Sequence, residues 1–571
     1  MSKRPPRSIW VADSETDPFL HGRVPEAFIW GCYNGEDYHE FDTVGEFVDF
    51  IREQHCIIYA HNGGKFDWHF LLDKLEPFAE VLIIEGRVSK FVIGEAEFRD
   101  SWNILPFALA KWQKDDFDYR ILERSVRNIP ANRAKIKVYL RSDCINLYTL
   151  VTEFQRRFGR SLTVSGAALK YWRTTSGAQF AAPESTALFY NTIAPYYYGG
   201  RVQVFEPGII ERPFIVVDIN GAYADAMKRD HPYGQIAEIT QTIPLHDDAL
   251  QRSMITVYAP SRGFMPYRDP RNLNALCFPD NNVWRSFTVT GWEYLAAREC
   301  GHLDADSQII QCVTFSDMVN FGGYIDEFAA IKTEAKRRLL INPNDMDALA
   351  DYLFAKLLQN ILYGKMASNP DEYQEHVVLE PEYLDIASQT DGYNFAAYVG
   401  KNVLASRPIA QAKKRFLNVA TAASITGFVR AKMARAMVTV DTPIYCDTDS
   451  FAANNVDSLD LHPTRLGAWD IEAECIGGAI AGKKMYAFDR GVIHEGPGRY
   501  KTATKGVRLN AQQIYAVAAG ESIDYKPAAP TFSIRNGIYF NDRSIVSTED
   551  STARLHRQDV EIGVDGVTYN P

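Results

Sequence analysis

Along the N-terminal part of the chain, short apolar runs alternate with longer segments in which apolar residues recur every three or four positions. The apolar runs, bounded by turn residues, predict strands at 8–15, 56–61, 80–86 and 90–96. The longer spacing predicts helices at 43–53 and 137–159. Strands that alternate with helices in this way are typical of an α/β domain, which we place at residues 1–165.

The rest of the chain mixes both patterns. A soft segment rich in Ala, Ser and Thr predicts a boundary, so we expect a linker at 166–190 and a larger domain over 191–571. The run PFIVVDI predicts a buried strand, a turn-rich mixed region follows it, and helical spacing predicts a pair of helices at about 322–366. A polar, strand-prone stretch, a helix and a hairpin around YCDTDS come next. Because similar strand and helix patterns recur after these intervening segments, we expect a single large domain with insertions.

Composition narrows the classes of protein. A chain of 571 residues is too long for one core, and 46% hydrophobic with 23% charged residues is ordinary for a globular protein. No run approaches the roughly 18 apolar residues that span a bilayer, and the N-terminus lacks the apolar core of a signal peptide. The eight cysteines stand singly without a CxxC pair, which favours neither a zinc site nor a disulfide framework. We therefore expect a protein of a reducing cytoplasm, with no membrane partner.

Local charge changes the picture given by the net charge of −11. Residues 483–508 hold seven basic side chains against two acidic ones, and residues 332–338 hold four against one. Such windows are often only solvated faces. They also leave room for a phosphate-backbone partner in a basic channel.

Acidic residues of the N-terminal domain occur at spacings that place them together. Asp13 and Glu15 lie two apart on a predicted strand and so project to one face. Asp67 follows a strand that ends in a Gly-Gly turn, and Tyr139 precedes Asp143 by one helical turn. Each pair alone is compatible with a charged surface edge or a simple neighbour contact. Together they would suit two-metal phosphodiester cleavage, with the tyrosine orienting the attacking water.

The larger domain repeats this logic. Asp218 ends a predicted buried strand, and Asp447 and Asp449 alternate at the tip of another. An ordinary hairpin turn explains Asp-Thr-Asp without any function. If folding brings Asp218 and Asp447 together, they could hold two Mg²⁺ ions that activate a 3′-hydroxyl and bridge a triphosphate.

One helix of the predicted pair carries a possible nucleotide-binding face. Lys356, Asn360 and Tyr363 recur at helical spacing, so they line one side. A half-buried helix with a snorkelling lysine is the alternative reading. A cation, an amide and an aromatic ring in this order could contact phosphates, a base edge and a sugar.

Eight motifs occur in one order: DSE, HNGGKFD, YLRSD, YYGG, DINGAY, KLLQNILYG, YCDTDS and KMY. Over residues 8–510 or so, the chain therefore resembles the protein-primed branch of the family B DNA polymerases, found in bacteriophages with linear genomes, including the tectivirus type. The resemblance implies an α/β and α+β multidomain fold, with an RNase H-like 3′–5′ exonuclease at 1–165 before a right-hand polymerase domain at 191–571. The implied polymerase parts are palm at 191–230 and 405–500, a first insertion contacting the priming protein at about 231–321, fingers at about 322–366, a second insertion at about 367–404, and thumb at about 501–571.

For the exonuclease, the resemblance implies that Asp13, Glu15, Asp67 and Asp143 bind metal and that Tyr139 orients water. It also implies a set of residues that hold the single-stranded 3′ end. They are Thr16, His61, Asn62, Phe66, Phe70, Ser101 and Trp102.

For the polymerase, the resemblance implies metal binding by Asp218 and Asp447, with Asp449 in the same turn, and stacking of Tyr223 beneath the incoming sugar. The nucleotide-binding residues of the fingers would be Lys332, Lys356, Asn360 and Tyr363. The template clamp would be Tyr197, Gly199 and Gly200, and the primer-template contacts would be Thr426, Arg430, Lys484 and Tyr486.

Two stretches depart from the family pattern. Ile121, beside Arg120, stands where the family has a catalytic lysine before its YxxxD helix, so we expect weaker proofreading. Residues 221–224, Gly-Ala-Tyr-Ala, replace the usual Ser-Leu-Tyr-Pro, and Ile361 replaces a serine after the helix asparagine, so we expect looser sugar discrimination.

The resemblance implies two Mg²⁺ ions per active site, with Mn²⁺ as an alternative, and as partners a DNA template, a primer strand, dNTPs and a separate terminal protein. A monomer working in the cytoplasm of a bacterial host, encoded by a virus or linear plasmid, is the matching expectation. Three rival hypotheses are an end-trimming nuclease, a primer-independent primase-polymerase of a related branch, and a DNA-binding remnant without activity.

Overall fold

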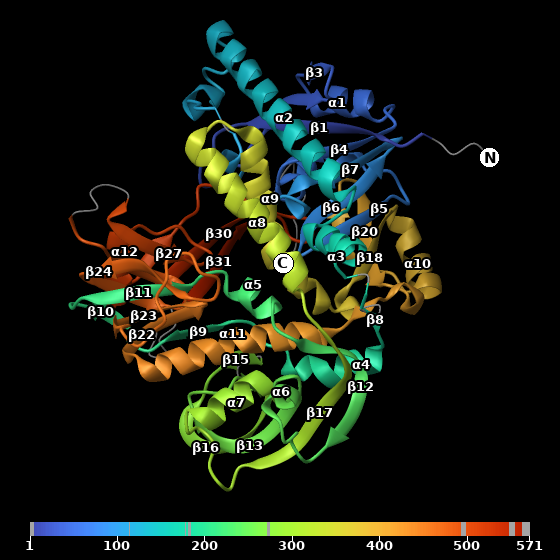
Figure 1. The fold of residues 1–571 in the computed structure, drawn as a ribbon. Coiled ribbons are helices and arrows are strands. Elements are labelled where there is room, and N and C mark those ends of the chain that lie inside the picture. The colour runs from blue at the N-terminus through green and yellow to red at the C-terminus, as the bar shows by residue number, and fades with distance from the viewer. Residues whose placement is uncertain are drawn as a thin grey trace.

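The computed structural model describes residues 5–547 and 554–561, except for residues 114, 178, 181–183, 271–273 and 493–497. The end of the segment predicted as thumb therefore lies outside the described residues. Figure 1 shows the chain from the N-terminal region in blue to the C-terminal sheets in red.

A ten-stranded sheet organises the N-terminal region. Its order is β19-β20-β18-β5-β6-β7-β4-β1-β2-β3. The N-terminal strands are β1 (Ser8–Thr16), β2 (Ala27–Tyr33), β3 (Tyr38–Phe41), β4 (Cys56–Ala60), β5 (Glu80–Ile84), β6 (Arg87–Ile93) and β7 (Ala96–Asp100). β1 runs parallel to β4 and β4 parallel to β7, while α2 (Pro130–Phe158) packs on β1 and β2 and α1 (Val44–Ile51) packs on β2 and β3. The strands and helices predicted here from periodicity are confirmed, and β2, β3 and β7 are additional.

Three strands of this sheet come from far along the chain. They are β18 (Gln374–Leu379), β19 (Asn394–Val399) and β20 (Asn402–Pro408), and α10 (Leu384–Asp391) lies between the first two. β18 pairs antiparallel with β5, and Val378 both donates to Ala79 O (2.9 Å) and accepts from Phe78 N (2.7 Å). The stretch predicted as the second insertion thus extends the N-terminal sheet, as Figure 1 shows beside β5 and β6.

The predicted linker at 166–190 is largely helical. Helix α3 (Val164–Thr175) fills its first part and α4 (Ala187–Ile193) begins at its end. α3 packs against α9 (Met346–Met366), because its residues Ala167, Ala168 and Trp172 are fully buried. The segment predicted as a linker therefore contains a helix that contributes to the core, since these residues form a buried apolar stripe.

A five-stranded antiparallel sheet, called the central sheet from here on, has the order β24-β11-β23-β22-β9. Its strands are β9 (Arg201–Val204), β11 (Phe214–Ile219), β22 (Asp441–Thr448), β23 (Ser450–Asn455) and β24 (Trp469–Cys475). The long helix α11 (Val419–Thr439) runs beneath it in Figure 1. One apolar cluster reaches from Val11 of β1 through α2, α9 and α11 to Val217 of β11, so the N-terminal and central regions share a core.

The turn-rich region after β11 folds into a sheet of its own, ordered β12-β17-β13-β16. Its strands are β12 (His231–Thr240), β13 (Met254–Arg262), β16 (Asp280–Thr290) and β17 (Gln308–Val319), joined by the short pair β14 (Tyr267–Asp269) and β15 (Ala275–Cys277). Helices α6 (Asp247–Gln251) and α7 (Gly291–Glu299) cover it, and α7 packs on α11.

The predicted helix pair is confirmed as α8 (Gly322–Ile341) and α9, antiparallel neighbours that stand beside α2 in Figure 1.

The C-terminal region adds two small sheets. These contain β10 (Gly208–Ile210), β25 (Gly477–Gly482), β26 (Met485–Asp489) and β27 (Tyr500–Thr504), and then β28 (Ile523–Tyr525), β29 (Thr531–Ser533), β30 (Gly537–Val546) and β31 (Arg554–Glu561), with α12 (Ala511–Ala518) between them. The short pair β8 (Glu184–Ser185) and β21 (Phe416–Leu417) closes the fold near α4.

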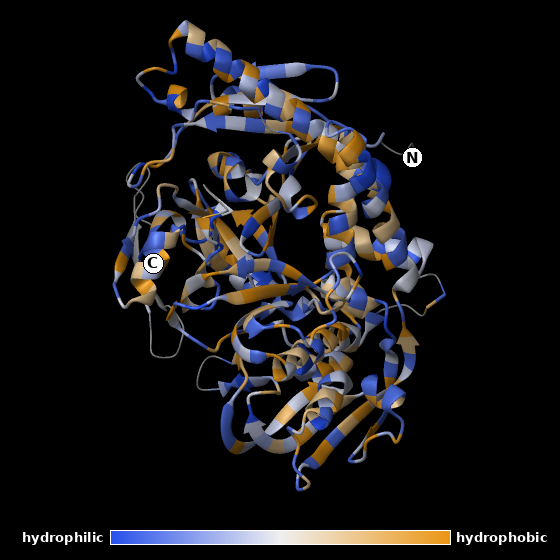
Figure 2. Cartoon of the chain, turned by 60° about the vertical axis from the view of Figure 1, so that its left-hand side comes forward, coloured by the Kyte–Doolittle hydropathy of each residue, from blue (hydrophilic) through white to orange (hydrophobic). Residues whose placement is uncertain are grey.

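Figure 2 shows hydrophilic and hydrophobic residues interspersed along the helices. No helix in the described part of the chain has the length and apolarity that crossing a bilayer requires.

The junction of β5 and β18 yields a first prediction. Val378→Pro should raise amide hydrogen exchange in residues 75–84, because proline removes the N–H that pairs with Ala79 and fits poorly inside a sheet. Val378→Ala keeps this N–H and serves as the control for the lost side-chain volume. Equal exchange in both variants, measured by mass spectrometry, would show that this backbone pairing does not hold the insertion to the N-terminal sheet.

Candidate active sites

Four acidic side chains meet at the open end of β1. Asp13 and Glu15 come from the strand, Asp67 from the 3-10 turn Asp67–Lys74 and Asp143 from α2. Burial raises the pKa of Asp13 well above its usual range, and the charges of Asp67, Asp143 and Glu15 raise it further. Each of these acids therefore acts electrostatically on Asp13, as the predicted convergence requires, while their metal-binding role remains a prediction.

One hydroxyl supports this cluster. Ser14 Oγ donates to Asp67 Oδ1 at 2.6 Å, and both side chains are buried. Burial nevertheless raises the pKa of Asp67 to about 7, because the bond from Ser14 only partly offsets desolvation. The cluster therefore holds negative charge at a cost that a bound cation would relieve.

Tyr139 faces the same cluster and has a partner that the sequence did not reveal. Its hydroxyl lies 3.1 Å from the hydroxyl of Tyr119, and the ring of Phe117 stacks on it at a centroid distance of 4.1 Å. Burial raises the pKa of Tyr139, with the bond to Tyr119 and the charge of Asp143 next in size. Ile121 from the same segment packs with Phe117 in an apolar cluster, which explains a hydrophobic residue at that position.

The residues predicted to hold a single-stranded 3′ end divide into a partly exposed group, which includes Asn62 and Trp102, and a buried group. Asn62 adopts a left-handed backbone with φ 64°, and its Oδ1 accepts from Arg87 at 2.8 Å. Arg87 also pairs with the buried Asp100 at 2.6 Å and lies over the ring of Trp102. Arg87 and Asp100 thus orient Asn62 and Trp102, a role that no motif in the sequence indicated.

Thr16 and Ser101 are buried in this conformation, and their predicted contact with DNA remains a prediction. The Thr16 hydroxyl donates to Asp17 O at 3.1 Å. The hydroxyl of Ser101 lies 3.0 Å from Nδ1 of His61 and donates to Ala60 O, and the His61 ring tilts against Trp102.

Two aromatic rings of this site contact the C-terminal region. The centroid of Phe532, on β29, lies 5.2 Å from that of Phe66 and 5.8 Å from that of Phe70, in edge-on geometry. Phe66 and Phe70 are only partly buried despite this contact. A surface of three aromatic rings therefore spans the N-terminal and C-terminal parts of the chain.

The second carboxylate cluster lies on the central sheet. Asp218 of β11 is paired in register with Ser450 of β23, and Ile219 N donates to Asp449 O at 2.9 Å. The hairpin between β22 and β23 is tight, because Asp449 N donates to Asp447 O at 2.8 Å and Thr448 has φ 66°. Folding therefore brings together the acids that the sequence separated, as predicted.

The three acids have different surroundings. Burial, and then the charge of Asp449, raise the pKa of Asp218 to about 7, and burial likewise raises that of Asp449 to about 6. Asp447 instead pairs with Lys484 Nζ at 2.5 Å. The electrostatic partner of Asp218 is therefore Asp449 more than Asp447.

Lys484 stands in the turn between β25 and β26 with φ 57°, and its backbone N–H donates to Tyr445 Oη at 3.0 Å. Tyr486 stacks on Phe488 with centroids 4.2 Å apart. The KMY motif thus lies directly behind the Asp-Thr-Asp turn, while the predicted contacts of Lys484 and Tyr486 with primer or template remain predictions.

A further acid belongs to this cluster. Glu472 of β24 raises the pKa of both Asp218 and Asp449, and it pairs with Lys501 of β27. Asp470, two residues earlier, lies opposite Asp218 in the sheet register. The alternation in WDIEAEC could have indicated this shared face, although the stretch matches no motif.

The fingers residues line one side of the helix pair. Lys356 and Asn360 are exposed on α9, and Lys332 of α8 donates to Gln359 Oε1 at 3.2 Å. Burial lowers the pKa of Lys332, and Lys336 and Lys356 lower it further. Three lysines close enough to repel one another provide an attractive surface for a triphosphate.

Tyr363 joins this helix to the catalytic sheet. Its ring stacks on Tyr223 of the short helix α5 (Ala222–Met227), with centroids 4.6 Å apart and planes 7° from parallel. Burial raises the pKa of Tyr223 to about 12, with the charge of Asp449 as the next cause. Tyr363, the last residue of the predicted face, therefore lies near the acids, and the charge of Asp449 acts on its hydroxyl.

The Tyr-Gly-Gly segment passes beside the Asp-Thr-Asp turn. A Cβ on Gly200 would lie 2.6 Å from Thr448 Cγ2, which explains why glycine is needed there, whereas a Cβ on Gly199 would meet nothing within 4 Å. Tyr197 lies near Tyr363, because a charge on the Tyr197 hydroxyl contributes to raising the pKa of Tyr363. The segment thus shapes the backbone next to the catalytic hairpin.

Arg430 and Thr426 of α11 are each only 2% exposed in this conformation, and their predicted contacts with DNA remain predictions. Arg430 donates from Nη1 to Tyr198 O and Gly199 O, at 2.6 and 2.9 Å, and from Nε to the buried Glu293 of α7 at 2.7 Å. A guanidinium used in this way holds the Tyr-Gly-Gly segment through Nε and Nη1, while its Nη2 has no hydrogen-bond partner among the described residues.

Both clusters suit hard divalent cations, because carboxylate oxygens are the donors such ions prefer and their raised pKa values show uncompensated repulsion. Even so, no three His, Cys, Asp or Glu side chains within the described ranges are arranged so that they could hold a metal ion. The residues fit the ions by donor type and charge.

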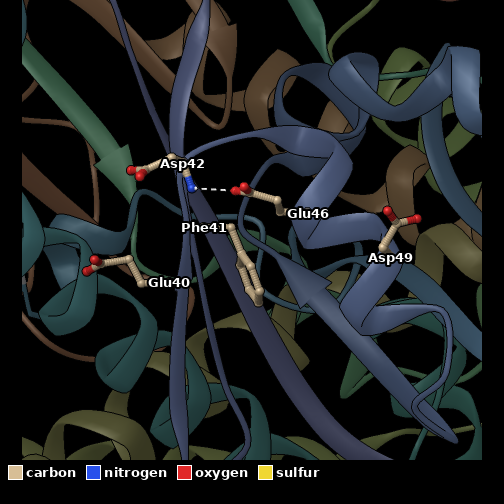
Figure 3. A pocket seen from close by; sticks show the side chains of 5 residues that line it. All are labelled: Glu40, Phe41, Asp42, Glu46 and Asp49. Carbon is tan, nitrogen blue, oxygen red and sulfur yellow. Dashed lines mark hydrogen bonds between the residues drawn. The ribbon is translucent and has the colours of Figure 1, made fainter.

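Two hollows lie away from these clusters. The larger, of about 550 Å³, is lined by Glu40, Phe41, Asp42, Glu46 and Asp49, and Figure 3 shows its carboxylates around the link between β3 and α1. Lys137 and Arg133 of α2 pair with Glu40 and Asp42 at its side. The other, of about 410 Å³, lies between the end of α2 and the helix pair α8 and α9.

Comparison with known proteins agrees with this geometry. The family model for type B DNA polymerases, organellar and viral, matches residues 117–464. The chain is 32% identical over 578 aligned residues to a DNA-directed DNA polymerase of Enterobacteria phage PRD1, covering 94% of this chain and 97% of that protein. A probable DNA polymerase of Neurospora intermedia is 22% identical, over 77% of this chain and 52% of its own. The fold matches that of Phi29 DNA polymerase complexed with primer-template DNA and incoming nucleotide substrates, with a TM-score of 0.71 and 20% identity, over 95% of this chain and 100% of that one.

The raised pKa of Asp67 yields a second prediction. Because its folded-state pKa of about 7 lies above the ordinary 3.8, the folded state binds more protons between these values and loses stability as pH rises through this window. Asp67→Asn should remove that loss, so in EDTA its melting temperature should exceed that of the wild type by roughly 1–2 °C at pH 8 and by less at pH 5.

Asp73→Asn provides the control, since Asp73 is half exposed and pairs with Lys74. Added Mg²⁺ should raise the melting temperature of the wild type more than that of Asp67→Asn. A pH-independent difference between the two proteins would contradict the repulsion inferred for this cluster.

Proposed function

The chain belongs to the organellar and viral type B DNA polymerases and is a DNA-directed DNA polymerase of the protein-primed phage type; from this premise we propose the residues, ions and partners through which it works. The observation that carries the proposal is the meeting of Asp218 and Asp449 opposite the Tyr223–Tyr363 stack and the fingers lysines. The acids would suit metal ions, the stacked aromatic rings would suit the sugar, and the lysines would suit the triphosphate of a bound nucleotide.

At the polymerase site, Asp218, Asp449 and Asp447 would hold two Mg²⁺ ions, with Mn²⁺ able to replace them. When bound, such ions neutralise the carboxylates and act as Lewis acids on phosphoryl oxygens. Lys332 and Lys356, with Asn360, would attract and orient the triphosphate. Tyr223 would support the sugar and, by its bulk, exclude a 2′-hydroxyl.

At the N-terminal site, Asp13, Glu15, Asp67 and Asp143 would hold a second pair of ions for 3′–5′ exonuclease action. Tyr139, its hydroxyl fixed by Tyr119, would orient the attacking water. Asn62, Phe66, Phe70, His61 and Trp102 would hold the unpaired 3′ end by stacking and hydrogen bonds. Their aromatic character and partial exposure support this role.

The parts of the right hand follow the chain. We assign an RNase H-like exonuclease to the N-terminal sheet, the palm to the central sheet, the fingers to α8 and α9, and the thumb to the C-terminal sheets. The sheet of β12, β13, β16 and β17 would contact a terminal protein, and β18 to β20 would enclose template DNA and support strand displacement. We further propose that the protein works in the cytoplasm of an infected bacterium, as a monomer acting on DNA, dNTPs and one terminal protein. The origin of its PRD1 relative in a bacteriophage supports this proposal.

The first experiment on this proposal separates the two activities. A 5′-labelled primer on a longer template should lengthen with Mg²⁺ and dNTPs and shorten without dNTPs. Asp449→Asn should lower extension by about a hundredfold or more and leave shortening, and Asp13→Asn should do the reverse, because each removes a carboxylate from one cluster only.

Asp460→Asn, an exposed acid paired with Arg465, is the matched control. Shortening without any extension would favour the end-trimming nuclease, and inactivity in both assays would favour the remnant. Synthesis on a primerless single-stranded circle would favour the primase-polymerase. Extension without shortening would show that Ile121 marks a real loss of proofreading.

Tyr223→Val should increase ribonucleotide incorporation by about tenfold or more, because the ring that would collide with a 2′-hydroxyl is removed. The check is the ratio of kcat/KM for a dNTP to that for the matching rNTP. An unchanged ratio would remove Tyr223 from sugar selection.

A further inference from the structure

Helix α5 carries Tyr223 on one side and a buried carboxylate, Asp225, on the other. Residues two apart on a helix point in nearly opposite directions. The Asp225 side chain is 8% exposed, while the ring of Tyr223 stacks on Tyr363. Whatever holds Asp225 therefore fixes the rotation of the helix that presents Tyr223.

The Asp225 carboxylate joins three segments. Lys432 Nζ of α11 donates to Asp225 Oδ2 at 3.0 Å and also to Gly467 O. Arg229 donates to the other oxygen at 3.0 Å. Gly467 packs directly against this carboxylate, because a Cβ built there would lie 2.4 Å from Asp225 Oδ2.

The loop at Gly467 leads to the catalytic strands. Gly467 N donates to Asn220 O at 2.8 Å, and Asn220 N donates to Ala468 O at 2.9 Å. Asn220 stands two residues after Asp218, and β24, with Glu472, begins at the next residue after Ala468. The pair of Asp225 and Lys432 thus ties the Tyr223 helix to both sides of the acid cluster.

We propose that Asp225 and Lys432 are positioning residues for nucleotide selection. They hold the ring of Tyr223 in the position at which it admits a deoxyribose and excludes a ribose. This rests on the role proposed for Tyr223. A buried carboxylate needs a paired charge. Arg229 follows α5 in the same segment, so it is Lys432 that ties Asp225 to α11. When either charge is lost, α5 is free to turn away from α11, and the ring of Tyr223 moves with it.

The test is single-nucleotide primer extension with dCTP and CTP, each with full kcat and KM. Asp225→Asn and Lys432→Met keep side-chain size but remove one charge each. Each should lower the dCTP-to-CTP ratio of kcat/KM about fivefold, and the double variant should lower it no further, because coupled neighbours are not additive. Lys432→Arg, which keeps the cation, should restore the ratio.

Loss of stability alone would slow both substrates equally and leave the ratio unchanged, which would overturn the proposal. Arg435→Met is the matched control on the same helix, since Arg435 pairs with the half-exposed Glu299 of α7, and its ratio should equal that of the wild type.

Tyr223→Val separates this proposal from the role on which it rests. If Tyr223→Val lowers the ratio and the Asp225 and Lys432 variants do not, the positioning role is wrong and the proposed function stands. If all of these variants keep the wild-type ratio, the sugar-selecting role of Tyr223 fails as well. Additive losses in the double variant would show that the two residues act separately, which also overturns the proposal.

Discussion

The register of β11 against the β22–β23 hairpin is the constraint on which the polymerase site depends. Asp218 lies opposite Ser450, and the backbone N–H of Ile219 bonds to Asp449 O. Since successive side chains of a strand alternate, a slip of one residue would turn Asp218 toward the apolar core. The buried residues Val216 and Val217, before Asp218, and Phe451 and Ala452, after the hairpin, make such a slip costly. Apolar packing thus sets the distance between acids that repel one another.

Carboxylates repel one another in both clusters, but different groups offset this repulsion in each. In the polymerase cluster, Lys484 neutralises Asp447 and Lys501 pairs with Glu472, so cations of the protein lie beside the acids. In the N-terminal cluster, three neighbouring carboxylates raise the pKa of Asp13 and a neutral hydroxyl supports Asp67. The N-terminal cluster therefore has the greater electrostatic need for a bound cation.

Sequence reasoning succeeded where function is carried by local pattern. β1, β11, the helix pair α8 and α9, and the Asp-Thr-Asp hairpin all follow from periodicity and turn chemistry. It failed where a contact joins distant segments. Nothing local in Gln374–Leu379 indicates that it completes a sheet begun by β5, and nothing near Arg430 reveals that Glu293 will bury it. Burial of a polar side chain depends on its partner, and that partner is fixed only by the tertiary fold.

The shared core explains how one chain can hold its two carboxylate clusters in fixed relation. Arg157 of α2 pairs with Asp351 of α9, and rings from both helices, Phe154 and Phe354, meet in edge-on geometry. The part of α9 near the turn from α8 is therefore packed against α2, whereas Lys356 and Asn360 are exposed further along α9. Because a close-packed contact resists deformation more than an exposed helical face does, any movement of α8 and α9 relative to the central sheet has to turn about this contact. Such a turn carries Tyr363 across Tyr223, so the stack between these rings lies where fingers movement meets the anchored part of the catalytic sheet.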